Sequence, residues 1–202
     1  MEGRRRNGQT ALTKNERIAC LGWGSLIWDT SRPFAVKGGW RDDGPSLPLE
    51  FARQSGGNRM TLVIVDIEHY VPALWAELDA ASLDQAVSVL AEREGVPNQR
   101  VIGRWPNKTE EQYPHQSAIA EWAIGKGLTG VVWTALPPGM KKTRSVMPTL
   151  AEVKTLLARL SSIESAGAIE YIHRAPGQIA TPYRSALESA FPSQDREASE
   201  HG

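Results

Sequence analysis

Three stretches with the pattern of β-strands follow one another closely in the first half of the chain. They cover residues 47–54, 60–66 and 71–78, and short polar segments separate them. The first connection, Ser55-Gly56-Gly57-Asn58, has the composition of a hairpin turn. Strands that are joined by tight turns usually pair with each other, so this region predicts an antiparallel sheet or a barrel.

Helical patterns dominate the rest of the chain. Ser82 is a predicted N-cap with Gln85 three positions later, as in a capping box, and Gly95 is a predicted end for the helix that follows. The other expected elements are a buried strand over 18–23, helices over 117–125, 166–174 and 182–190, a helix starting at Thr149, and a strand over 130–135. Strands followed by helices predict an α+β fold.

The chain has 202 residues, of which 41% are hydrophobic, and this is enough for one core. We therefore expect one domain over residues 16–191, between disordered polar tails at 1–15 and 192–202. The formal net charge is zero, which argues against a nucleic-acid partner. No stretch approaches the ~20 apolar residues of a membrane helix, and no signal-peptide pattern is present, so we expect a cytoplasmic protein with no membrane partner. The sequence leaves the oligomeric state open.

The expected strand over 18–23 runs into a loop with two glycines, Gly22-Trp23-Gly24-Ser25-Leu26-Ile27-Trp28. Glycines let a ligand approach the backbone closely. Successive N–H groups in such a turn can bind an anion or a developing oxyanion. From these residues alone, an ordinary turn is the more common explanation.

Residues 21–28 resemble the F-G-Y-G-S-L-I-W motif of the ChaC-type branch of the γ-glutamylcyclotransferase superfamily, with six of eight positions identical. Further matches are Phe51, Gln54, Ser55, Arg59 and residues 61–63, the strand at 75–78, the helix end Glu92-Arg93-Glu94-Gly95, and a looser match over 171–187. Two of the departures from the pattern concern the expected site: Trp23 replaces the tyrosine of the family, and Gly95 replaces a lysine of the ChaC branch. Residues 97–165 do not match closely.

The resemblance implies a mixed, mainly antiparallel barrel-like sheet surrounded by helices, and an enzyme that needs no cofactor. Such an enzyme converts a γ-glutamyl amine or peptide, as in glutathione metabolism, to 5-oxoproline and a free amine. Glu94 is implied as the general base. Spacing alone favours a solvated carboxylate at a helix end for Glu94, and Glu92 points elsewhere on the same helix.

The resemblance also places the substrate at the loop, with Gly22, Trp23, Gly24, Ser25 and Leu26 as binding residues. Two arginines are candidates for the α-carboxylate of the substrate, because a guanidinium binds a carboxylate with two hydrogen bonds; they are Arg53 and Arg59. Tyr183 is a candidate to close the site, although a half-buried structural tyrosine is an equal alternative.

Metal and cysteine chemistry are not expected. His69, His115, His173 and His201 lack the spacing of metal ligands, and the single Cys20 excludes a multi-cysteine zinc site. Two other functions stay open: a non-catalytic small-molecule binding module on the same scaffold, and an interaction protein organised by residues 97–165, which could instead form a substrate lid.

Overall fold

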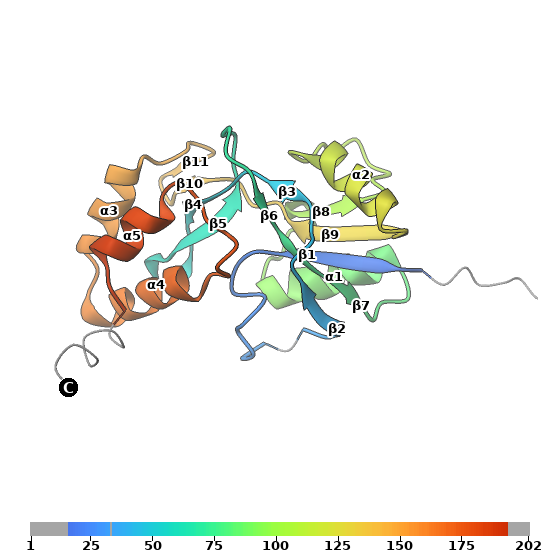
Figure 1. Cartoon of the computed structure of the whole chain (residues 1–202), viewed down its shortest axis with the longest axis horizontal. Helices are drawn as coiled ribbons and strands as arrows, with labels where there is room; N and C mark the ends of the chain where they lie inside the picture. Colours follow the sequence, from blue (N-terminus) through green and yellow to red (C-terminus); the bar gives the residue numbers. More distant parts are fainter. Residues whose placement is uncertain (1–15, 33, 194–202) are drawn as a thin grey trace, which may run out of the picture.

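The computed structural model describes residues 16–32 and 34–193 (Figure 1). The predicted α+β class is confirmed, because five α-helices accompany three β-sheets in this part of the chain. The sequence predicts disordered tails at 1–15 and 192–202. The first tail lies outside the described residues, and so does the second apart from residues 192 and 193. The single domain over 16–191 stays a prediction, although one cluster of buried side chains does include residues from both large sheets.

The larger sheet has five strands. Their order across the sheet is β2 (Val36–Arg41), β7 (Leu74–Leu78), β1 (Ile18–Gly22), β9 (Gly130–Thr134) and β8 (Ile102–Trp105). All neighbours are antiparallel except β1 and β9. Residues of β1 alternate between the two faces: Cys20 packs with α1 (Leu83–Glu94), whereas Leu21 belongs to the cluster that includes side chains of α2 (Gln116–Gly125).

The second sheet has four strands, in the order β11 (Thr143–Arg144), β10 (Gly139–Met140), β4 (Leu49–Gln54) and β5 (Met60–Ile64). The last three helices lie beside this sheet (Figure 1); they are α3 (Leu150–Ala158), α4 (Ser162–Arg174) and α5 (Arg184–Ala190). A two-stranded ribbon of β3 (Ser46–Leu47) and β6 (Val71–Pro72) joins the two halves of the fold. No helix within the described ranges is long and apolar enough to cross a bilayer.

The expected barrel is not confirmed. Strands 47–54 and 60–66 do pair, as β4 and β5, but 71–78 leaves them and β7 pairs with β1 instead. The backbone N–H of Gly44 donates to the carbonyl of Ala73 at this crossing, where a Cβ on Gly44 would lie 2.3 Å from the same oxygen. The described strands therefore form separate open sheets, and no closed barrel is found among them. Mainly antiparallel pairing is confirmed.

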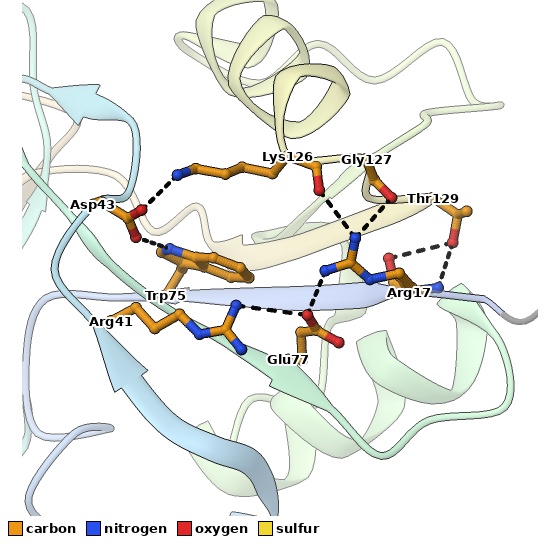
Figure 2. Close-up of polar contacts among 8 residues, drawn as sticks. All are labelled: Arg17, Arg41, Asp43, Trp75, Glu77, Lys126, Gly127 and Thr129. Carbon is orange, nitrogen blue, oxygen red and sulfur yellow. Dashed lines mark hydrogen bonds and ion pairs between the residues drawn. The ribbon is translucent and has the colours of Figure 1, made fainter.

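Ion pairs and hydrogen bonds fix one face of the larger sheet (Figure 2). The carboxylate of Glu77 pairs with Arg17 at 2.5 Å and with Arg41 at 3.6 Å. Asp43 pairs with Lys126 at 2.5 Å and accepts a hydrogen bond from the indole of Trp75. Every cation of this network therefore has a carboxylate partner.

Candidate functional site

A cavity of about 440 Å³ lies where the two large sheets meet. Its walls come from the loop after β1, the end of α1, strands β4 and β5, the β10–β11 hairpin and α4. The lining residues are Leu21, Gly22, Trp23, Gly24, Ser25, Leu26, Arg32, Arg53, Ser55, Gly56, Arg59, Thr61, Leu62, Val63, Glu94, Val96, Thr134, Leu136, Lys141, Arg144 and Tyr171. The glycine loop and Glu94, which the sequence places far apart, thus line one cavity.

The loop after β1 is a compact turn. The N–H groups of Ile27 and Asp29 donate to the carbonyls of Gly24 and Ser25, at 3.0 and 2.8 Å. The N–H groups of Gly24 and Leu26 have no acceptor among the described residues. The turn therefore leaves backbone donors at the cavity wall, as an oxyanion or carboxylate site requires.

Glu94 is placed by the local signals of its helix. The hydroxyl of Ser82 accepts from the N–H of Gln85 at the start of α1, and Gly95 ends the helix with φ of 65°. The carboxylate of Glu94 has no hydrogen bond or ion pair within the described part of the chain. Burial raises the pKa of this carboxyl above its ordinary value, against the opposing charges of Arg93 and Arg32. Glu94 is therefore partly desolvated rather than a solvated helix-end residue.

Arg93, the residue before Glu94, fastens the loop to the helix. Its side chain is 6% exposed, and one guanidinium nitrogen donates to the carbonyls of Ser25 and Asp29, at 3.3 and 3.0 Å. The same nitrogen lies 3.6 Å from the carboxylate of Asp29. This contact sets the position of Glu94 relative to the backbone donors of the loop.

Tyr171 is a site residue that the sequence did not single out. Its hydroxyl accepts a hydrogen bond from the N–H of Leu62 at 3.3 Å, and its own proton has no acceptor among the described residues. A Cβ on Gly24 would lie 2.2 Å from this oxygen. Burial raises the pKa of Tyr171, with a further contribution from the negative charge of Glu94. The phenol is therefore a neutral donor near Glu94.

Trp23 contributes to this arrangement from the protein interior. Its side chain is 4% exposed, and its indole N–H donates to the carbonyl of Leu62 at 3.1 Å. The two backbone groups of Leu62 thus hold the side chains of Trp23 and Tyr171. Trp23 lacks the phenolic hydroxyl of the tyrosine that it replaces. Tyr171, which comes from α4 far along the sequence, supplies a phenolic hydroxyl to the cavity instead.

The charged side chains of the cavity are mostly cationic. Both arginines proposed from the sequence, Arg53 and Arg59, line it. Three further cations that the sequence did not single out join them: Arg32, Lys141 and Arg144. Lys141 and Arg144 lie in the segment without a close family match, where no local pattern marks them. Glu94 is the one carboxylate among the lining residues.

Tyr183 does not lie where the sequence interpretation expected it. Its hydroxyl donates to the carbonyl of Pro148 at 3.1 Å, and its N–H donates to the buried carboxylate of Glu50 at 3.0 Å. Both contacts hold Tyr183 outside the cavity lining, against the start of α3. The alternative of a half-buried structural tyrosine describes it better.

No group of three or more His, Cys, Asp or Glu side chains suited to a metal ion forms within the described ranges. The expectation of a site without metal or cofactor stays a prediction. The polar side chains of the cavity are mostly donors. The Glu94 carboxylate is an acceptor, and five hydroxyls can donate or accept, those of Ser25, Ser55, Thr61, Thr134 and Tyr171. The arrangement can therefore bind an anionic molecule and exchange a proton with it at one carboxylate.

Comparisons with known proteins give a likeness to solved structures only. No family model and no curated protein matches the chain. Among solved structures, the chain is similar to the crystal structure of a glutathione-specific γ-glutamyl cyclotransferase from yeast, with 15% identity and a TM-score of 0.41 over 87% of this chain and 98% of the other. A likeness of this extent assigns neither a family nor an activity, so the function has to be argued from the geometry of the site.

Proposed function

We propose that the chain is a γ-glutamylcyclotransferase-like enzyme that converts a γ-glutamyl amine or peptide to 5-oxoproline and a free amine. One observation carries the proposal: the carboxylate of Glu94 is the one acidic group lining a cavity that the Gly22–Leu26 loop also lines. The reaction needs these two components, a base for an amine and donors for an oxyanion.

The reaction is an intramolecular acyl transfer. Glu94 takes a proton from the α-ammonium group, and the free amine attacks the γ-carbonyl carbon of the same glutamyl group. The tetrahedral intermediate collapses, the bond between this carbon and the leaving nitrogen breaks, and Glu94 gives the proton to that nitrogen. The ring nitrogen then loses its second proton through Glu94 to the released amine, which leaves as an ammonium ion. Atoms and charge balance without water, because the two protons that the α-nitrogen loses are the two that the leaving nitrogen gains. The main tasks of the site are therefore to fold the substrate and to move these protons.

The environment of Glu94 suits both halves of this proton transfer. An ordinary glutamate is a weak base for an ammonium group, and burial raises the pKa of Glu94 toward the working range. The N–H groups of Gly24 and Leu26 and the hydroxyl proton of Tyr171 are the donors for the oxyanion. Arg59 is the ligand for the α-carboxylate, because its charge acts on Glu94 and its guanidinium lies 6.0 Å from the ring centre of Tyr171.

The test is to incubate the purified chain with a panel of γ-glutamyl amides and peptides and to detect 5-oxoproline. Formation of 5-oxoproline from at least one substrate, with release of an equal amount of amine, is the expected result. A chain that binds γ-glutamyl compounds without turnover would instead be the non-catalytic binding module. A pocket that only binds a glutamyl carboxylate gains nothing from Glu94, and this favours the enzyme.

A further inference from the structure

Arg53 and Arg144 flank the same glycine across three adjacent strands. Gly139 of β10 pairs with Arg53 of β4 on one side and with Arg144 of β11 on the other. Residues in register on neighbouring strands point to the same face of a sheet, and both side chains line the cavity. A Cβ on Gly139 would lie 2.2 Å from the carbonyl oxygen of Thr143, so the tight hairpin that brings Arg144 to this row requires glycine.

These two arginines use few of their donors within the protein. One nitrogen of Arg53 donates to the carbonyl of Pro137 at 2.7 Å, and one nitrogen of Arg144 donates to the carbonyl of Gly139 at 2.8 Å. A guanidinium has five N–H donors. Neither arginine pairs with a carboxylate within the described residues. Burial and the neighbouring charge of Arg144 lower the pKa of Arg53, as expected for like charges held together.

Lys141 adds a third cation to this wall. Its ammonium donates to the side-chain oxygen of Asn58 at 2.8 Å, and its backbone N–H donates to Gln54 at 2.9 Å. Both partners are neutral amides, and Lys141 has no carboxylate within ion-pair distance among the described residues, although its charge acts on the more distant Glu164. The network on the larger sheet is the contrast, because each of its cations has a carboxylate partner (Figure 2).

We propose that Arg53, Arg144 and Lys141 form an anion subsite that binds a doubly charged acidic end of the leaving amine, such as an amino acid with a side-chain carboxylate. The inference rests on the proposed cyclotransferase function and names its substrate class. One carboxylate is matched by one bidentate guanidinium, so two arginines and a lysine fit a dianion better than a single negative charge. A leaving amine that is neutral, or a polyamine, would leave the cations of this wall without an anionic partner. Arg59 then serves the glutamyl α-carboxylate, and Arg53 serves the leaving amine.

Binding measurements with a variant of strongly reduced turnover test the subsite. Calorimetric titration of the Glu94→Gln protein compares γ-glutamyl-glutamate with γ-glutamyl-glutamine, which has nearly the same shape and one negative charge less. The acid should bind at least about 10-fold more tightly, and added salt should reduce the difference. Equal affinity of the two compounds would overturn the proposal.

Two substitutions on the β10–β11 hairpin distinguish direct binding of the ligand by Arg144 from a general effect of positive charge near the cavity. Arg144→Gln, at an exposed position, should remove most of the preference for the acid, whereas Lys142→Gln removes a charge of the same hairpin that lies outside the cavity and should keep it. Equal effects of both variants would also overturn the proposal. Melting temperatures show whether each variant is folded, and Lys141→Gln is a second test of the same wall.

The wild-type chain distinguishes failure of this inference from failure of the proposed function. Equal turnover of the acid and the amide to 5-oxoproline would contradict the anion subsite and support the cyclotransferase activity. The converse result is that the acid binds, that this binding depends on Arg144, and that no compound of the panel gives 5-oxoproline. It would contradict the cyclotransferase activity and support the anion subsite. Neither binding nor turnover would remove both.

Discussion

The hydroxyl oxygen of Tyr171 occupies the space into which a side chain on Gly24 would extend. A Cβ at Gly24 would lie 2.2 Å from this oxygen and 3.2 Å from the ring carbon that carries it. The contact joins α4 to the loop after β1 across a wide gap in sequence. It explains why a residue without a side chain is needed at Gly24, and it leads to a test that requires no substrate.

Gly24→Ala should destabilise the fold by roughly 1–3 kcal/mol, the usual cost of inserting a methyl group into a packed site. Tyr171→Phe should cost about 1–3 kcal/mol, because the N–H of Leu62 loses its acceptor. The double variant should be more stable than the sum of the two effects, since removing the hydroxyl removes the closest contact of the new methyl group. Urea denaturation of all four proteins measures this coupling. Simple additivity would argue against the contact.

Glu94→Gln should reduce turnover by roughly 10²–10⁴-fold against any γ-glutamyl substrate that the wild-type chain accepts. Glutamine keeps the shape of the side chain but cannot take the ammonium proton. Glu92→Gln is the matched control, because Glu92 is exposed and lies outside the cavity lining. It should leave turnover nearly unchanged. Equal losses in the two variants, or no loss in Glu94→Gln, would mean that the base is another group.

The pH dependence of turnover should reflect the environment of Glu94. The carboxylate must be ionised to accept a proton, and burial raises the pKa of Glu94. Activity should therefore fall on the acid side at a pH above about 4.3, the pKa of an ordinary glutamate. The profile of kcat/KM against pH measures this pKa in the free enzyme. An acid limb at or below 4.3 would contradict the desolvation of Glu94.

The same pKa shift predicts the sign of a stability effect. Since the folded state binds the Glu94 proton more tightly than the unfolded chain, this residue contributes stability at low pH that is lost as the pH rises through its folded pKa. Glu94→Gln should therefore gain stability relative to wild type at neutral pH, and this gain should vanish below about pH 4. Thermal unfolding of both proteins over this range gives the comparison. A loss of stability at pH 7 would show that the carboxylate has a structural role.

Glu50 should be essential for stability rather than for turnover. Its buried carboxylate accepts hydrogen bonds from the N–H of Phe51 at 2.8 Å, the hydroxyl of Thr181 at 2.6 Å and the N–H of Tyr183 at 3.0 Å. Glu50→Ala leaves these donors unpaired and should cost roughly 2–5 kcal/mol. Glu68→Ala, at an exposed position, should change the free energy of unfolding by less than about 0.5 kcal/mol. A similar small change in Glu50→Ala would contradict the assignment.

Local patterns predicted the elements that local interactions determine. The helix between Ser82 and Gly95 appears as α1, with the expected N-cap and a left-handed Gly95 at its end. The cap at Thr149 also forms, as a capping box with Glu152. The loop at Gly22 and Glu94 were singled out by the family resemblance of the short motifs around them, and both line the cavity. Each of these features depends on a few residues that are adjacent in the chain.

Features that depend on distant contacts were missed. No strand is predicted around Gly38 and Gly39, yet this stretch forms β2, whose register with β7 shifts between Lys37 and Arg41. The partner of β7 was also missed. Strand β7 could pair with β5, which is nearer in the chain, or with β1, and only the packing of the whole fold favours β1. Tyr171 reaches Leu62 across 109 positions. No pattern along the chain encodes such a contact.

The buried guanidinium of Arg93 also determines which wall of the cavity can move. Separating the turn at Ser25–Asp29 from α1 would leave this cation without its carbonyl partners, at a cost of several kcal/mol. The turn and the end of the helix should therefore fluctuate together, with slow amide hydrogen exchange. Among the described contacts, the β10–β11 hairpin has no buried charge as an anchor. It is held by the pairing of β10 with β4 and by the hydrogen bonds of Lys141 to Gln54 and Asn58, so a ligand should enter and leave past the exposed Arg144.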